Sequence, residues 1–464
     1  EEIKETVTTN IVLEDQSIRE SYLQAAPFVG RELELSQLFQ GMKRNKDGRG
    51  SAWLIGGAVG VGKTRLMDEL RIRGLVNGFI VLRGYSTENN DMPYRLWRDP
   101  LKRLALSVDV SATEANILRT LMPDIEALLQ RKIPDAMQQE FTAYADQLTS
   151  IVLRLFQRLD RPTVLLLDDV QDEQESLDVL NSLTAIVRNQ PLMIVASYRT
   201  DQVPDMPAKL PSMKAINLPR FSDGDIESLS VSMMGESARR DDVQSLLKRE
   251  AEGNIYFLIE VIRALAESAG RLRLIGDVPL PEKIVSGGLQ DVLARRLNLV
   301  TGVDLTLLRI MAHGGRELDL RLLRHLAGES DVDFDNWLAK VSNVSVLERQ
   351  DEVWRFAHER LREQVIEKQD TTANKEAHSA IAHGLETVYP NAPEQAATIA
   401  YHWRGAGNED KELQALLTAG DYALRLNTFA EAVRHFERAL SVMPEDNSTK
   451  RARTQIKYGE ALQN

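Results

Sequence analysis

The sequence predicts an α/β domain built on a doubly wound parallel sheet, followed by a long helical region. Two observations predict this fold class. Short apolar strands alternate with helical patterns from about residue 51 to residue 219, and helical patterns then dominate from residue 222 onward. Such alternation is typical of a parallel sheet that is covered by helices on both faces. Because 464 residues are too many for one hydrophobic core, we expect about three to five domains.

The composition excludes several classes of protein. Hydrophobic residues make up 43% of the chain and charged residues 27%, and no apolar run reaches the roughly 18 residues of a membrane span. The absence of cysteine excludes disulfides, thiolate zinc sites and cysteine nucleophiles. The net charge of -12 disfavours DNA as a partner, because binding to its phosphates needs clustered Lys and Arg. We therefore expect a cytoplasmic protein with no membrane partner.

A glycine-rich loop between a strand and a helix is the first segment that carries chemistry. The strand is expected over 51–56, the loop over 57–64 has the pattern GxxxxGKT, and a helix follows over 65–73. In this context glycines let backbone N–H groups turn inward around phosphates at the positive end of a helix. Lys63 would reach the β- and γ-phosphates, and Thr64 would offer its hydroxyl to Mg²⁺. The nucleotide-binding residues expected here are Gly57, Gly60, Val61, Gly62, Lys63, Thr64 and Arg65.

An acidic pair at the end of a buried strand completes the expected catalytic site. The stretch 162–169 has four apolar residues in a row and ends in Asp168 and Asp169. We assign Asp168 to Mg²⁺ and Asp169 to orienting or deprotonating the attacking water. A further strand over 192–196 leads to Arg199, which can sense the γ-phosphate. The alternatives are a strand that merely ends in an acidic turn and a surface arginine without a functional contact. The pattern predicts a P-loop ATPase that binds ATP or ADP, with Asp169, Lys63 and Arg199 as its catalytic residues.

Three further blocks resemble one family of P-loop ATPases. The segment 28–35 (FVGRELEL) resembles the hhGRE signature of the STAND class, 252–258 (EGNIYFL) resembles its eGNPffl motif, and 354–363 (WRFAHERLRE) resembles its yrFrHdllRe motif. The order and spacing of these blocks match the class from residue 27 to about residue 445. The STAND class includes bacterial regulators such as MalT and AfsR and the NLR receptors. The resemblance is to the bacterial kind, in which an AAA-type ATPase module precedes C-terminal tetratricopeptide repeats.

This resemblance implies further contacts with the nucleotide. Val29, Gly30 and Arg31 would border the adenine and ribose, although Arg31 could simply be a charge at the start of a helix. Ile255 stands where the family usually has a proline that packs against adenine, so base selectivity stays open. His358 matches the histidine that contacts the ADP β-phosphate and holds the family's receptors closed. The alternative for His358 is a histidine of the core.

The resemblance also divides the chain into domains. Ser222 is a plausible N-cap at the start of a helical lid. Helical patterns over 289–299, 304–311 and 318–326, with a hairpin over 344–356, predict a winged helix. The spacing of small and aromatic residues in the last section predicts a tetratricopeptide unit; these residues are Gly420, Ala423, Phe429, Ala432, Phe436, Ala439 and Pro444. The expected domains are a linker (1–26), a nucleotide-binding domain (27–220), the lid (221–285), the winged helix (286–370) and the repeats (371–464).

The function that the resemblance implies is an ATP/ADP-dependent signalling switch. ADP would hold a closed form, ATP would favour an open form that self-associates, and slow ATP hydrolysis would reset the switch. A protein or small-molecule signal would act through the repeats, and an N-terminal effector domain is expected outside this sequence. Two alternatives stay open: an AAA+ initiator or transcriptional regulator that binds DNA through its winged helix, and a scaffold that holds ADP without hydrolysis.

Overall fold

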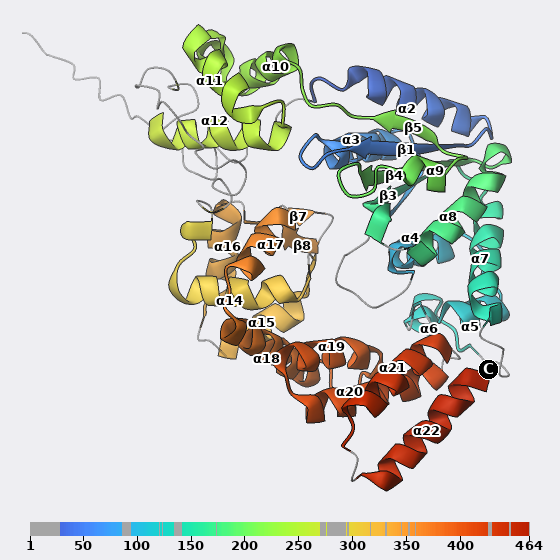
Figure 1. Ribbon diagram of the computed structural model, residues 1–464. Coiled ribbons are helices and arrows are strands. Elements are labelled where there is room, and N and C mark those ends of the chain that lie inside the picture. The colour runs from blue at the N-terminus through green and yellow to red at the C-terminus, as the bar shows by residue number, and fades with distance from the viewer. Residues whose placement is uncertain are drawn as a thin grey trace, which may run out of the picture.

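The computed structural model gives the chain four consecutive modules. It describes residues 28–85, 94–119, 121–122, 124–133, 142–172, 174–269, 275, 294, 297–315, 317–329, 332–344, 346–350, 353–357, 359–425, 429–444 and 447–463. Figure 1 shows the sheet domain, a helical layer beside it, a mixed module below that layer, and a row of helices that curves back toward the sheet domain. None of the helices in the described ranges combines the length and apolar character that a membrane span needs.

The first module is built on a five-stranded parallel sheet with the strand order β2-β3-β4-β1-β5. Its central strands β3 and β4 are buried along their whole length, as expected for the apolar strands of a parallel sheet that is covered on both faces. The strands are β1 (Ser51–Gly57), β2 (Ile80–Tyr85), β3 (Thr163–Asp168), β4 (Leu192–Arg199) and β5 (Lys214–Asn217).

Two hydrophobic cores, one on each face, make the sheet doubly wound, as predicted. Alternate residues of β3 belong to different cores, because successive side chains of a strand point to opposite faces. Val164 and Leu166 pack with residues of α2 and α3, whereas Leu165 and Leu167 pack with residues of α4, α7 and α8. The helices are α2 (Glu32–Lys46), α3 (Lys63–Val76), α4 (Arg95–Ala105), α5 (Ala112–Leu118), α6 (Ile125–Leu128), α7 (Thr142–Gln157), α8 (Gln174–Ile186) and α9 (Met206–Lys209).

The second module is a helical layer. It starts where Ser222 caps a helix: the Ser222 hydroxyl accepts from the Asp225 N–H, and the Asp225 side chain accepts from the Ser222 N–H. This is the predicted helix start, reinforced by a reciprocal capping box. The helices are α10 (Asp223–Met234), α11 (Asp241–Ala251) and α12 (Ile255–Ala269).

The third module combines helices with a three-stranded antiparallel sheet of order β6-β8-β7. The predicted hairpin is present as β7 and β8, and the second and third predicted helices are α14 and α15. Most of the first predicted helix, 289–299, lies outside the described residues. The third predicted helix, expected from residue 318, starts later, because Leu318 belongs to strand β6, whose two residues are too few to show an alternating pattern in the sequence. The elements are α14 (Gly302–His313), β6 (Glu317–Leu318), α15 (Leu320–Glu329), α16 (Phe334–Asn343), β7 (Leu347–Gln350), β8 (Val353–Phe356) and α17 (Glu359–Glu367).

The last module is a row of helices packed on their sequence neighbours. Gly420 is a point of close approach, since a Cβ atom there would lie 2.5 Å from the Phe436 ring. The row returns to the sheet domain: burial raises the pKa of Tyr422 to about 12, and the nearby charges of Arg119 and Arg98 act against that rise. The helices are α18 (Thr371–Val388), α19 (Ala396–Ala406), α20 (Glu409–Arg425), α21 (Phe429–Val442) and α22 (Ser448–Gln463).

Candidate nucleotide-binding site

The glycine-rich loop joins the C-terminal end of β1 to the first turn of α3. Gly60 and Gly62 have φ angles of 81° and 97°, in the left-handed region that favours glycine. No side chain caps α3, which begins at Lys63, directly after Gly62. The first N–H groups of a helix have no partner within the helix, so this end offers donors and a positive dipole to an anion.

Lys63 is folded over the loop. Its Nζ atom donates to the carbonyl oxygens of Gly57, at 2.8 Å, and of Ala58, at 3.0 Å. The residue is only 8% exposed, and burial lowers the pKa of Lys63 while the charges of Asp169 and Asp168 act against that shift. The ammonium group is therefore held where a phosphate chain in the loop would meet it.

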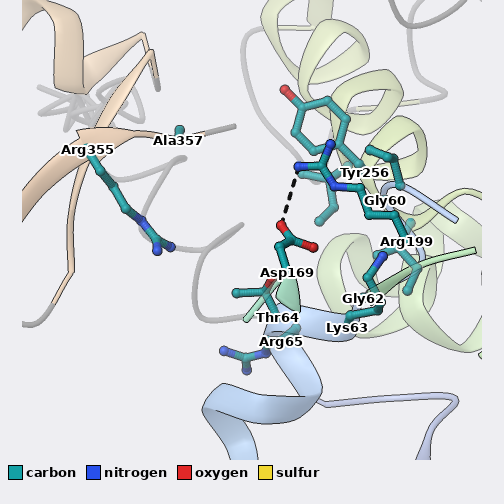
Figure 2. A pocket seen from close by; sticks show the side chains of 13 residues that line it. Gly60, Gly62, Lys63, Thr64, Arg65, Asp169, Arg199, Tyr256, Arg355 and Ala357 are labelled. Atoms are coloured by element: carbon teal, nitrogen blue, oxygen red, sulfur yellow. Dashed lines mark hydrogen bonds and ion pairs between the residues drawn. The ribbon is translucent and has the colours of Figure 1, made fainter. Parts of the chain in front are cut away.

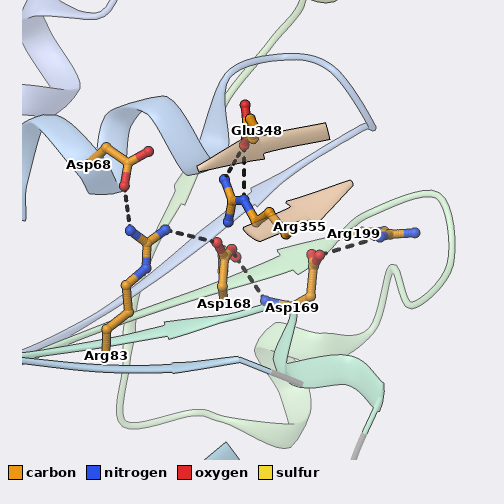
Figure 3. Close-up of polar contacts among 8 residues, drawn as sticks. Asp68, Arg83, Asp168, Asp169, Arg199, Glu348 and Arg355 are labelled. Atoms are coloured by element: carbon orange, nitrogen blue, oxygen red, sulfur yellow. Dashed lines mark hydrogen bonds and ion pairs between the residues drawn. The ribbon is translucent and has the colours of Figure 1, made fainter. Parts of the chain in front are cut away.

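Asp168 is buried behind the loop. The Ser197 hydroxyl donates to Asp168 Oδ1, and Arg83 Nη2 lies 3.4 Å from Asp168 Oδ2 (Figure 3). Arg83 also forms an ion pair with Asp68 of α3. Although burial opposes the charge, the carboxylates of Asp168 and Asp68 raise the pKa of Arg83. Asp168 is therefore tied to β4 through Ser197 and to β2 through a charged arginine.

Asp169 has a different charged partner from Asp168. Its φ of 53° is uncommon for a residue other than glycine, and its N–H donates to the Ser197 hydroxyl at 3.0 Å. Asp169 Oδ2 pairs with Arg199 Nη2 at 3.3 Å. The carboxylates of the two acids thus pair with different arginines, whereas both residues bond to the Ser197 hydroxyl.

A pocket of about 230 Å³ opens in front of the loop. Its walls come from the glycine-rich loop and α3, the ends of β3 and β4, helix α12, and the β8 end of the hairpin (Figure 2). The lining residues are Val59, Gly60, Gly62, Lys63, Thr64, Arg65, Asp169, Arg199, Ile255, Tyr256, Ile259, Arg355 and Ala357.

The pocket brings together part of the predicted site. The predicted residues that line it are Gly60, Gly62, Lys63, Thr64, Arg65, Asp169, Arg199 and Ile255. The predicted residues outside its lining are Val29, Gly30, Arg31, Gly57, Val61 and Asp168. His358 lies outside the described residues.

Arg31 contacts the glycine-rich loop outside the lining of the pocket. Its guanidinium donates to the carbonyl oxygen of Pro219 and, at 3.5 Å, to that of Val61, and it lies 4.9 Å from the centre of the Phe221 ring. The side chain is therefore used to join the start of α2 to the loop and to the start of the second module.

Helix α12 contacts the loop directly. Asn254 Nδ2 donates to the Val59 carbonyl at 3.0 Å. A Cβ atom at Gly60 would lie 2.4 Å from Asn254 Oδ1, and one at Gly62 would lie 2.9 Å from Ile255 Cδ1. Ile255, at the position of the family proline, thus packs against the loop, and only glycines allow this approach.

Several residues of the site were missed by the sequence reasoning. They are Arg83, Ser197, Tyr256, Ile259 and Arg355. The one signal for Arg83 was its charge directly after the apolar stretch 79–82, which placed an arginine at the end of an expected strand. Arg355 lies within the third resemblance block, three residues before His358, but no local pattern connects it with a loop some 290 residues earlier.

The donor set fits a nucleotide with Mg²⁺ rather than a metal held by protein alone. In the described part of the chain no cluster of three or more His, Cys, Asp or Glu side chains could hold a metal ion. Mg²⁺ commonly binds through one or two protein oxygens together with phosphate oxygens and water. Thr64 and the acidic pair, beside a phosphate cradle, match that requirement.

Comparisons with known proteins agree with this geometry. A family model described as "AAA ATPase domain" matches residues 27–195. No curated protein matches the chain. Of the solved structures, Aeropyrum pernix ORC1 in complex with DNA is 16% identical with a TM-score of 0.37, covering 76% of this chain and 96% of that chain.

Two other solved structures are similarly distant. Drosophila ORC bound to DNA is 14% identical with a TM-score of 0.37, covering 79% of this chain and 94% of that chain. Domain III of the Thermotoga maritima replication initiation protein DnaA is 15% identical with a TM-score of 0.31, covering 56% of this chain and 97% of that chain. The family match and the geometry of the phosphate loop together show that residues 27–195 carry an AAA-type ATPase domain of the P-loop class.

Proposed function

We propose that this chain is a nucleotide-dependent signalling switch of the STAND type, closed with ADP and opened by exchange for ATP. The observation that carries the proposal is the make-up of the pocket, whose walls come from the first three modules of the chain. A ligand that fills such a pocket favours one arrangement of the modules over another. It shifts the equilibrium by its difference in affinity for the two arrangements.

The charges of the pocket favour a polyphosphate. Among the lining residues, Lys63, Arg65, Arg199 and Arg355 are cationic, and Asp169 is the one acid. The volume of about 230 Å³ is below the roughly 300–1,000 Å³ of pockets that enclose a whole small ligand. The phosphate chain would therefore occupy this pocket, and the base would extend along Ile255 and out of the pocket toward Val29.

The catalytic roles follow from the partners of the acidic pair. Asp169 would orient or deprotonate the attacking water, and Lys63 and Arg199 would stabilise the charge of the transferring phosphate. Thr64 and Asp168 would hold Mg²⁺, and the bound ion would neutralise part of the negative charge of the phosphates. Asp169 is paired with Arg199, and Asp168 with Arg83 and Ser197, and we propose that both acids exchange partners before turnover. Such a requirement favours slow, regulatory hydrolysis.

The remaining modules would act as the switch and the sensor. We propose that 221–285 is the lid, that 286–370 is a winged helix used as a switch element, and that 371–464 is an array of tetratricopeptide-like repeats. The charges of Arg98 and Arg119 act on Tyr422, and this effect supports a closed form in which the last module lies close to the ATPase domain. A protein or small molecule that binds the repeats would compete with that contact and free the chain for self-association.

Binding and single-turnover measurements test this proposal. We expect calorimetry to detect both ADP and MgATP, and single-turnover hydrolysis to be slow but measurable. Binding without turnover would instead support the ADP-holding scaffold. DNA binding that weakens steeply between two salt concentrations would support the initiator alternative. If neither nucleotide bound, the proposal would be wrong.

A further inference from the structure

Strand β8 presents two faces to different surroundings. Trp354 and Phe356 pack with the hydrophobic core of the third module, and Phe356 is fully buried there. Arg355 lines the pocket in front of the glycine-rich loop, as does Ala357, which follows the strand and also packs against that core. Side chains alternate between the two faces of a strand, so the core contacts of Trp354 and Phe356 direct Arg355 toward the pocket.

Arg355 is held at the pocket by a carboxylate of the same hairpin. Glu348 of β7 lies directly opposite Arg355 in the strand register. Arg355 Nη2 and Nε both donate to Glu348 Oε1, at 2.7 Å and 2.9 Å (Figure 3). The Arg355 side chain is 9% exposed, whereas that of Glu348 is 33% exposed. The arginine is thus buried in the wall of the pocket, and its partner is the more accessible to water.

The position of the hairpin relative to the other walls supports a role in the pocket. Figure 2 shows Arg355 and Ala357 on the hairpin side, across the pocket from Lys63 and Thr64. The charge of Arg355 acts on Tyr85 at the end of β2, and that of Glu348 acts on Tyr256 of α12. Arg355 lines the pocket together with residues of the ATPase domain and of α12, and it adds to the positive charge of the pocket walls.

We propose that Arg355 is a phosphate-binding residue, and that it exchanges Glu348 for the phosphate chain when a nucleotide binds. The inference rests on the proposed function in one respect, that the pocket binds a nucleotide. A guanidinium that donates two parallel N–H groups suits a phosphate as well as a carboxylate. The exchange draws the β7–β8 hairpin onto the ligand, so that the phosphate chain joins the third module to the glycine-rich loop.

If Glu348 and the phosphate chain compete for Arg355, substitutions of the two residues should change nucleotide affinity in opposite directions. If Glu348 holds Arg355 away from the ligand, only part of the protein is ready to bind, and the apparent affinity is lowered by that fraction. Glu348→Gln removes the competing charge and should tighten the binding of MgATP. Arg355→Gln removes the phosphate contact and should weaken binding. A purely structural ion pair predicts that both variants lose stability and that neither gains affinity.

The test is a double-mutant cycle on the full chain, read by calorimetry with ADP and MgATP. We expect Arg355→Gln to weaken binding of MgATP about tenfold or more, as for loss of a charge-assisted contact. We expect Glu348→Gln to tighten it several-fold, and to change nothing when added to Arg355→Gln. Arg349→Gln is the matched control, since it removes the same charge from an exposed position of the same hairpin and should leave both affinities unchanged.

The outcomes separate this inference from the proposed function. If the wild type binds both nucleotides while Arg355→Gln binds equally well, or Glu348→Gln binds no more tightly, the inference is overturned and the proposed function stands. If the wild type binds neither nucleotide, both are overturned. Should Arg355→Gln fail to fold, as judged by thermal unfolding, Glu348→Gln alone decides through the presence or absence of its gain in affinity.

Discussion

Asn254 of the second module donates from Nδ2 to the carbonyl oxygen of Val59 in the glycine-rich loop, at 3.0 Å. The same side chain starts helix α12, because Asn254 Oδ1 accepts from the N–H groups of Tyr256, at 3.0 Å, and Phe257, at 3.3 Å. The side-chain amide of Asn254 therefore caps the N-terminal end of α12 and also binds the glycine-rich loop. A ligand that reshapes the loop must act on α12 as well.

Lys63→Ala tests the phosphate cradle. The Lys63 ammonium bonds to loop carbonyls, and a phosphate chain in the loop would take it over as a charge-assisted donor. Such contacts are worth about 1.5–3 kcal/mol each, so affinity for ADP and MgATP should fall at least about tenfold. Calorimetry measures both affinities. Unchanged values would refute the assignment of Lys63.

Asp168→Asn should cost stability as well as weaken the dependence on Mg²⁺. The substitution removes one of the two carboxylates that raise the pKa of the buried Arg83. Removing one partner of a buried ion pair lowers the free energy of unfolding by about 3–5 kcal/mol. Because Asp68 still pairs with Arg83, we expect a loss near about 3 kcal/mol.

Asp68→Asn is the comparison for that variant. It removes the other carboxylate beside Arg83 but leaves the acidic pair intact. Denaturant unfolding should therefore show a loss in both variants, whereas the Mg²⁺ dependence of ATP binding should change only in Asp168→Asn. A change of Mg²⁺ dependence in Asp68→Asn alone would contradict the metal assignment of Asp168.

Gly420→Ala should destabilise the row of helices in the last module. A Cβ atom at Gly420 would lie 2.5 Å from the Phe436 ring, closer than real contacts allow, and overpacking of this kind costs about 1–3 kcal/mol. Gly459→Ala is the matched control in helix α22, where a Cβ atom would meet nothing within 4 Å. At that position the change to alanine should raise the free energy of unfolding by about 0.5–1 kcal/mol. Equal melting temperatures for the two variants would contradict the close approach of α20 and α21.

Acid should weaken the packing between the third module and the last module. The Nδ1 atoms of His378 and His402 lie 3.0 Å apart, and the His313 ring is 4.5 Å from that of His378. Burial, and then the charge of the neighbouring histidine, lowers the pKa of His378 to about 4 and that of His402 to about 3. Both lie below the value of about 6.5 for an unfolded chain.

The direction of the pH effect follows from those pKa values. Between about pH 6.5 and pH 4 the unfolded chain binds protons that the folded chain excludes, so stability falls as the pH falls through this window. Each histidine contributes at most about 1.4 kcal/mol per pH unit. Thermal unfolding from pH 7 to pH 5 should therefore show a steep loss that is reduced in His402→Gln. The same slope in both proteins would show that carboxylates elsewhere cause the loss.

Short-range patterns made much of this fold predictable. The glycine-rich loop needs glycine at positions 60 and 62, because the backbone there has positive φ angles and other residues approach it closely. These requirements fall on neighbouring residues, so a short sequence motif predicts the loop. The buried strand that ends at Asp168 and the N-cap at Ser222 depend likewise on neighbours in the chain. Gly420 and Phe436, which meet across α20 and α21, follow a known repeat spacing.

The rest depends on contacts between distant segments. Asp168 was assigned from its place at a strand end, but its partner Arg83 comes from a strand 85 residues earlier, through the order of the sheet. Arg355 reaches the pocket only because the third module folds back onto the ATPase domain. No periodicity or motif spacing encodes such a return, which is why the sequence reasoning missed the cationic residue on the far wall.

If the nucleotide sets the arrangement of the modules, sedimentation velocity on a hydrolysis-deficient protein should detect the difference between ADP and MgATP. Asp169→Asn should keep nucleotide binding while slowing hydrolysis, because it leaves Lys63 and the loop intact. With ADP we expect a compact monomer. With MgATP we expect this variant to sediment as a more open or assembled species. Identical sedimentation with the two nucleotides, both shown to be bound, would contradict the account.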